Sequence, residues 1–308
     1  MTVYALLNSR RLAGAYEFVI APGEPTRVDV RTVLFARERI EMLGIAPLTS
    51  MYFYGENSQR PLGAWRPEIH DSDGLAIASR GGEWLWQPLL NPSAITVSSF
   101  PAADTRTFGL LQRDHEFASY EDPGTKYHLR PSGTVDLIGG FDAGRVVLVQ
   151  LPSDNEFLDN VVAFWSPTGA IAAQTRLALQ YRLNFGEPEV AQSPLARVVH
   201  TFVGRDVNAV SALADRQRFI VDFAGGPLDE LETDAPVAAI ITPSADVGVL
   251  EYQLEHLEAA NVWRLSILTR TAADKLLSLR AGLTLNGRRL SELWSYELEA
   301  GNVLRQPR

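Results

Sequence analysis

The sequence predicts an all-β protein, and three observations lead to this prediction. Several stretches alternate between two faces with a period of two, as strands with one buried face do. In Thr175–Leu183, three leucines and a tyrosine share one face with Thr175, while two arginines and a glutamine lie on the other. β-branched runs bounded by Gly or Pro, such as Val146–Leu151 and Ile95–Phe100, are typical of further strands. Long apolar stripes with helical period are scarce.

We expect the 308 residues to form two domains joined by a linker. Residues 1–185 hold the first strands, and 186–198, which begins GEPEVAQSP, breaks the pattern with Gly, Pro and polar residues. Residues 199–303 are expected to form an immunoglobulin-like sandwich and 304–308 a tail, with a short helix at 208–216. The strand-like runs in the second domain are Gln217–Phe223, Pro236–Thr242, Gly248–Leu254, Val262–Thr269, Leu279–Leu285 and Leu293–Leu298.

Composition excludes several classes of protein. The net charge of −9 argues against a nucleic-acid partner, and the absence of cysteine removes disulfides, thiolate nucleophiles and cysteine-based zinc sites. No apolar run approaches the roughly 18 residues of a membrane helix. Residues 8–11 interrupt the apolar start of the chain, so we expect no signal peptide in it. Five scattered histidines lack metal-ligand spacing, and we expect neither a metal nor a cofactor.

Two segments place a carboxylate beside aromatic residues, as sugar sites do. They read RPEIHDSDGL (Arg66–Leu75) and DNVVAFW (Asp159–Trp165). Glycoside cleavage needs one carboxylic acid to protonate the leaving oxygen and a second carboxylate on the other side of the ring, which makes Asp71 and Asp159 candidates. The alternative is a polar turn whose Asp side chains bind backbone amides while Gly74 takes a positive φ. A calcium loop is disfavoured, because the ligand spacing and terminal Glu of an EF-hand are missing.

The aromatic residues also leave two interpretations open. Trp84 and Trp86 lie two residues apart, hence on one strand face, where the indoles either stack on a sugar ring or form a core pair between sheets. Tyr127, followed by Arg130, either caps a cleft or packs on the sandwich edge. Phosphate-loop, dinucleotide-binding, serine-hydrolase and zinc-protease motifs are absent from the sequence, which leaves carboxylate chemistry or pure binding.

Seven segments together resemble the MdoG (OpgG/OpgD) family of periplasmic glucan biosynthesis proteins, in the family's order and over almost the whole chain. They are GIAPLTSMYFYGEN (Gly44–Asn57), RPEIHDSDGL, GEWLWQPL (Gly82–Leu89), FGLLQRDHEF (Phe108–Phe117), YHLRPS (Tyr127–Ser132), DNVVAFW and WSYEL (Trp294–Leu298). The resemblance implies a large sandwich like that of galactose mutarotases, here partial, followed by the immunoglobulin-like domain. It also implies a periplasmic location and a role in making osmoregulated periplasmic glucans, which are β-1,2-linked.

The resemblance further implies a site. Some members of the family hydrolyse β-1,2-glucan with inversion, and their general acid falls on Asp159, their base-side carboxylate on Asp71 and a substrate-contacting tyrosine on Tyr127. An acid that stays protonated needs desolvation, which we expect from Phe157, Phe164 and Trp165. The alternative is a non-catalytic glucan-binding scaffold that docks a membrane glucosyltransferase. The expected substrate-binding residues are Tyr127, Trp84, Trp86, His70, Asp73, Arg113, Arg130 and Trp165.

This chain departs from the family's pattern in three places. Where relatives read WRPLNNP, residues 86–92 read WQPLLNP and lack the arginine and one asparagine. Relatives carry a tryptophan after RPS, and here Gly133 and Thr134 follow. Relatives also have a long segment before the equivalent of Met1, so the chain resembles the C-terminal part of such a protein. The first two changes remove groups able to bind sugar.

Overall fold

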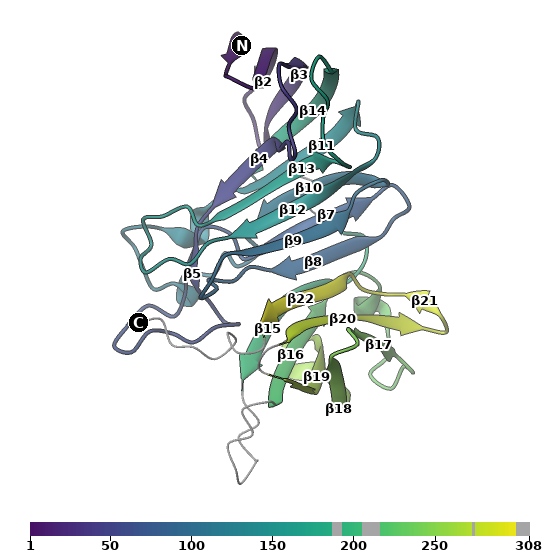
Figure 1. Cartoon of the computed structure of the whole chain (residues 1–308). Helices are drawn as coiled ribbons and strands as arrows, with labels where there is room; N and C mark the ends of the chain where they lie inside the picture. The colour runs from purple at the N-terminus through teal and green to yellow at the C-terminus, as the bar shows by residue number, and fades with distance from the viewer. Residues whose placement is uncertain (187–192, 205–215, 273–274, 300–308) are drawn as a thin grey trace.

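The computed structural model describes residues 1–186, 193–204, 216–272 and 275–299. Within these ranges the chain is almost entirely β, as the sequence predicts (Figure 1). The helical turns described are short 3-10 segments: η1 (Phe117–Ser119), η2 (Tyr127–Leu129), η4 (Gly226–Glu230) and η5 (Glu258–Ala260). None of the helices in these ranges is long and apolar enough to cross a membrane. The all-β prediction is therefore confirmed.

One sheet runs through most of the described chain. Its strands follow the spatial order β1-β2-β3-β14-β11-β10-β7-β8-β22-β20-β17, and a short strand, β21 (Arg288–Arg289), pairs with β20. The alternation predicted for Thr175–Leu183 becomes the register of β14, in which Leu179 and Tyr181 are buried. The bounds are β1 Thr2–Asn8, β2 Leu12–Ala21, β3 Thr26–Ala36, β14 Arg176–Gly186, β11 Ser132–Gly139, β10 Thr105–Leu111, β7 Gly74–Ser79, β8 Trp84–Pro88, β22 Leu293–Glu299, β20 Leu276–Leu285 and β17 Ala238–Pro243.

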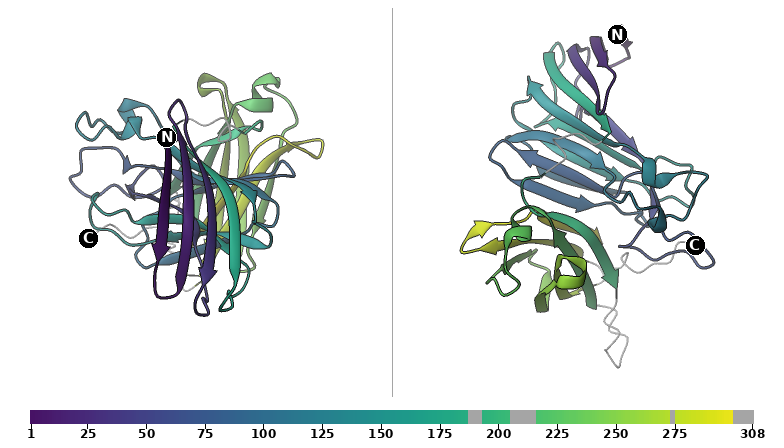
Figure 2. Two further views of the ribbon diagram at one scale, coloured as in Figure 1. Left: turned by 90° about the horizontal axis from the view of Figure 1, so that it is seen from above. Right: turned by 180° about the vertical axis from the view of Figure 1, so that it is seen from behind.

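Two smaller sheets cover different parts of this long sheet (Figures 1 and 2). The first, in the order β4-β13-β12-β9, encloses the core of the first sandwich, which contains Leu34, Phe108 and Val146. The second, β15-β16-β19-β18, encloses a separate core with Phe219 and Trp294. The bounds are β4 Ile45–Ser50, β13 Val161–Pro167, β12 Gly144–Gln150, β9 Thr96–Pro101, β15 Arg197–Gly204, β16 Arg216–Ala224, β19 Val262–Thr271 and β18 Val247–Leu257. A further pair, β5 (Tyr52–Tyr54) with β6 (Ile69–His70), leads to the candidate site.

The two sandwiches share the long sheet. β8 of the first pairs in parallel with β22 of the second, at Leu293 with Leu85 and Trp294 with Trp86. The contact between the sandwiches is thus made by backbone hydrogen bonds as well as side chains.

The division of the chain at residues 186–198 stays a prediction. Residues 187–192 of that linker lie outside the described residues. So do most of the helix expected at 208–216 and the whole tail.

Gly74 is required by packing. Its φ is not among the positive values described for this chain, so the positive φ that the polar-turn alternative gives to Gly74 is wrong. A Cβ atom built at residue 74 would instead overlap the indole ring of Trp86, which belongs to the neighbouring strand β8. We expect Gly74→Ala to lower the free energy of unfolding by about 1–3 kcal/mol, the usual cost of overpacking a core.

Urea denaturation of the two proteins would measure this change. Gly248→Ala is the matched control, because a Cβ at that strand position meets only the Arg270 carbonyl oxygen, at 3.8 Å. An equal effect of both substitutions would show that strand glycines, and not the Trp86 contact, set the cost.

Candidate functional site

Asp71 and Asp159, which are 88 positions apart in the sequence, line one groove. The groove has a volume of about 280 Å³, near the lower end for ligand pockets. Its walls come from β4, β10, β11 and the end of β14, together with the loops that carry the two carboxylates. The lining residues are Leu48, Thr49, Ser50, Asp71, Ser72, Leu110, Arg130, Pro131, Gly133, Asp159 and Phe185. The groove therefore unites both candidate catalytic residues with Arg130.

Asp71 is fixed directly after β6. Its backbone N–H donates to the Met51 carbonyl oxygen at 2.8 Å, and the buried hydroxyl of the next residue, Ser72, bonds Ser50 on β4 at 2.9 Å. The Asp71 carboxylate forms an ion pair with Arg130, whose Nε lies 2.9 Å from Oδ1. Both side chains remain partly exposed, so the pair is available to a ligand in the groove.

The surroundings of Asp71 act on its charge in opposite directions. Burial is the largest effect and raises the pKa of its carboxyl group, and the like charge of Asp159 raises it further. The positive charges of Arg130 and His70 lower it, but not enough to cancel burial. The net result is a pKa above the ordinary value for an aspartate. Asp71 and Asp159 thus interact electrostatically across the groove.

Asp159 is held through its neighbour Asn160. The Asn160 side chain is fully buried, and its Nδ2 donates to the carbonyl oxygens of Tyr52 and Leu151 at 2.9 and 3.1 Å. Its Oδ1 accepts the Tyr52 N–H at 2.8 Å. Asp159 itself is exposed, and Phe157 is 89% exposed, so Phe157 does not provide the apolar cover that we expected around the acid. The backbone position of Asp159 is therefore defined, whereas its carboxylate faces solvent.

A second cluster of hydrogen-bonded side chains connects the loop before Asp159 with the turn at Tyr127. Arg66 forms two hydrogen bonds to Glu156, at 2.6 and 3.1 Å, and a third to Asp122 at 2.9 Å. The hydroxyl of the buried Tyr127 donates to Glu156 at 2.7 Å. The hydrogen bond from Arg66 is the main reason that the pKa of Glu156 is lowered. Tyr127 lies beside the groove, with the Arg130 guanidinium 5.5 Å from its ring centroid, and does not line it.

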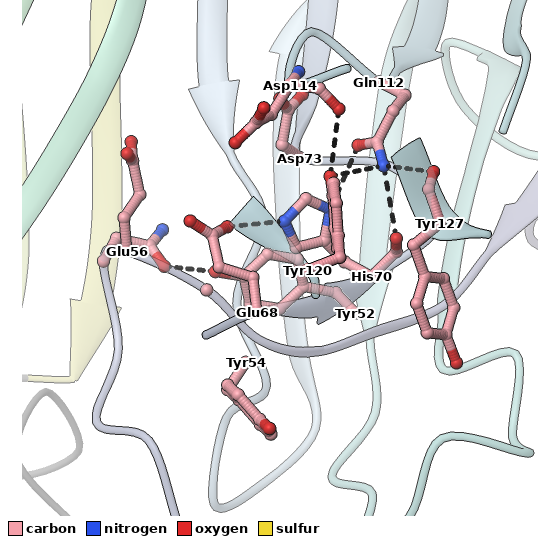
Figure 3. Close-up of polar contacts among 12 residues, drawn as sticks. Tyr52, Tyr54, Glu56, Glu68, His70, Asp73, Gln112, Asp114, Tyr120 and Tyr127 are labelled. Carbon is pink, nitrogen blue, oxygen red and sulfur yellow. Dashed lines mark hydrogen bonds and ion pairs between the residues drawn. The ribbon is translucent and has the colours of Figure 1, made fainter. Parts of the chain in front are cut away.

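His70 is buried and not exposed to a ligand, and its ring lies between Glu68 and Gln112 (Figure 3). Its Nε2 lies 2.8 Å from Glu68 and its Nδ1 3.0 Å from Gln112. With 1% of its surface exposed, His70 has no free face for a sugar. The predicted substrate contact of His70 is therefore not supported by its position, and we assign it a different role below.

Asp73 and Arg113 lie at the contact between the sandwiches. Asp73 Oδ2 accepts the backbone N–H groups of Arg113 and Asp114, at 2.9 and 3.2 Å. Asp73 thus binds backbone amides, as the alternative for this motif has it, but the amides belong to a segment 40 residues later and not to a local turn. The Arg113 guanidinium forms a two-pronged pair with Glu292, both distances being 2.9 Å, and donates to the Val198 carbonyl oxygen at 2.8 Å. With these partners Arg113 joins the two sandwiches and does not line the Asp71 groove, and neither does Asp73.

The three tryptophans expected to contact sugar are packed inside the protein. Trp84 and Trp86 share a face of β8, as predicted, but each is about 4% exposed. The Arg113 guanidinium covers the Trp86 ring at 3.5 Å from its centroid. Trp165 belongs to the first core and meets Phe141 edge to face at 4.9 Å. These positions favour the core-pair alternative, and none of the three lines the Asp71 groove.

Sequence reasoning singled out neither Gln112, Glu156 nor Asn160. Each lies inside or next to a segment that carried the resemblance: Gln112 in FGLLQRDHEF, Asn160 in DNVVAFW and Glu156 three residues before that segment. Their roles depend on partners 8 to 108 positions away, such as Tyr120 for Gln112 and Tyr52 for Asn160. Such distant pairing leaves no local pattern in the sequence.

Comparison with known proteins identifies relatives of the whole chain. Glucans biosynthesis protein G of Ralstonia nicotianae is 43% identical over 308 residues, covering 98% of this chain and 61% of that protein. The protein of the same name from Serratia proteamaculans is 39% identical, covering 97% and 59%. Probable glucans biosynthesis protein D of Shewanella oneidensis is 41% identical, covering 96% and 55%.

These relatives share the region that contains the groove and both sandwiches. The chain spans about three fifths of the length of the relatives that it matches. The family model described as periplasmic glucan biosynthesis protein, MdoG, matches residues 1–298, which include Asp71, Arg130 and Asp159. On this evidence the chain belongs to the MdoG family of periplasmic glucan biosynthesis proteins.

Proposed function

We propose that this chain binds β-1,2-glucan in the groove between Asp71 and Asp159 and hydrolyses it with inversion in the periplasm. The observation that supports the proposal is the meeting of these two carboxylates, from separate loops, in one groove. Asp159 would donate its proton to the leaving glycosidic oxygen, and Asp71 would accept a proton from the attacking water. Arg130, paired with Asp71, would orient the base and contact sugar hydroxyls.

The surroundings of the two carboxylates suit these roles unequally. Asp71 has a cation at 2.9 Å that favours the ionised form needed by a base. Asp159 is exposed, and a carboxylic acid that must stay protonated usually needs a desolvated setting. Bound glucan would have to exclude water from Asp159. The exposure of Asp159 favours a second candidate function, in which the chain binds glucan without cleaving it.

Incubation with linear β-1,2-glucan separates the two functions. We expect new reducing ends to accumulate with time, and the first-formed anomer to have the configuration opposite to that of the substrate. Linear β-1,3-glucan is the control polymer and should yield none. Saturable binding of β-1,2-glucan without reducing ends would favour the binding function, and neither binding nor cleavage would contradict both.

A further inference from the structure

The amide of Gln112 can be oriented from its partners alone. Its Nε2 lies within hydrogen-bond distance of two carbonyl oxygens, those of His70 at 3.3 Å and Tyr127 at 3.2 Å. A carbonyl oxygen only accepts, so the group that faces both must be the NH2. Its Oε1 therefore faces His70 Nδ1, at 3.0 Å. Because an amide oxygen also only accepts, Nδ1 of His70 must carry a proton.

The other ring nitrogen of His70 faces a carboxylate. Nε2 lies 2.8 Å from Oε2 of Glu68, whose side chain is 14% exposed. An ionised Glu68 accepts and does not donate, so with Glu68 ionised Nε2 carries a proton as well. With both nitrogens protonated, the ring is an imidazolium cation. Gln112 thus fixes a proton on Nδ1 by hydrogen-bond geometry, and an ionised Glu68 places the second proton on Nε2.

The remaining neighbours of His70 are compatible with a buried cation. Tyr52 stacks on the ring, with centroids 5.3 Å apart and planes within 15°, and Tyr120 meets it edge on at 5.1 Å. Burial lowers the pKa of His70, but the hydrogen bond and charge of Glu68, with the charges of Asp73 and Asp114, leave the pKa above its ordinary value.

We propose that His70 is held as a buried imidazolium whose positive charge favours the ionised form of the neighbouring Asp71, which makes His70 a positioning residue of the groove. The two residues are consecutive. His70, at the end of β6, is buried, and Asp71, directly after β6, lines the groove. Gln112 also joins the His70 backbone to that of Tyr127, three residues before Arg130. The inference rests on the proposed function only in treating Asp71 as the base.

The charge of His70 can be read directly by 15N NMR of its ring. We expect both nitrogens to show imidazolium shifts at pH 7, above the usual titration midpoint of about 6.5 for histidine. A neutral tautomer at pH 6 would overturn the proposal. This measurement uses the unaltered protein, so it does not depend on any variant being able to fold.

The effect on Asp71 is tested with His70→Gln, which keeps polar groups in the cavity and removes the charge. We expect the pKa of Asp71, followed by 13C NMR of its carboxyl carbon, to rise above its value in the unaltered protein, because the positive charge of His70 lowers it. His256→Gln, in β18 of the second sandwich, is the matched control and should leave Asp71 unchanged. An unchanged Asp71 in folded His70→Gln would contradict the proposal.

The pH dependence of glucan hydrolysis tests the role of His70 independently of NMR. If the chain cleaves glucan, the acid side of the pH profile of kcat/KM should move to higher pH in His70→Gln, because Asp71 then takes up its proton at higher pH. A purely structural role would lower the rate at all pH values without moving the profile. If there is no cleavage, the proposed function fails, while the two NMR measurements still decide the role of His70.

Discussion

Arg113→Ala is expected to lower the free energy of unfolding by about 3–5 kcal/mol, the usual cost of breaking a buried ion pair from one side. Glu292 is fully buried, and the substitution leaves its carboxylate without the two hydrogen bonds from Arg113. The Val198 carbonyl oxygen loses a donor, and the Trp86 ring loses the guanidinium that covers it. Urea denaturation followed by tryptophan fluorescence would measure the change.

Two further variants of this chain show whether the buried ion pair causes the loss of stability. The double variant Arg113→Met with Glu292→Met should recover much of the lost stability, because an apolar pair often replaces a buried ion pair at little cost. Arg39→Ala removes a pair with Glu41 in which both side chains are mostly exposed, and should change stability little. If Arg113→Ala is no more harmful than Arg39→Ala, the contact between the sandwiches does not depend on this pair.

The strands could be predicted because their signal is local. Thr175–Leu183 alternates residue by residue, and this pattern is enough to place Leu179 and Tyr181 on the buried face of β14. The same reasoning put Trp84 and Trp86 on one face of β8, but it left open what covers that face. The answer depends on Arg113, which covers the Trp86 ring, and on the second core, in which Trp86 lies with Phe219, more than 100 residues later in the chain.

The candidate site was predicted in part. The resemblance placed Asp71 and Asp159 as a pair, and the structure puts both in one groove. Asp73, two residues after Asp71, was expected to bind substrate, but it faces the contact between the sandwiches and binds backbone amides. The resemblance also could not separate the exposed Arg130 from the buried Arg113, because each lies in a polar segment of similar composition. Only the fold decides which charged residue reaches the groove.

Asp159→Asn is expected to reduce the rate of glucan cleavage by about 10²–10⁴, the usual contribution of a general acid. An amide has nearly the shape of the carboxyl group but cannot give a proton to the leaving oxygen. The exposed position of Asp159 makes a large loss of stability unexpected, so unfolding would not account for the result. Reducing ends released from linear β-1,2-glucan, measured at saturating substrate, would report kcat.

Asp154→Asn supplies the matched control, since Asp154 is exposed on the same loop and does not line the groove. Its rate should equal that of the unaltered protein. Asp159→Asn should also lower the pKa of Asp71, because it removes the like charge that raises it. Carboxyl NMR of Asp71 can follow this shift even where no cleavage occurs. A variant that cleaves at the full rate while the Asp71 pKa falls would show that the two carboxylates interact but that Asp159 is not the acid.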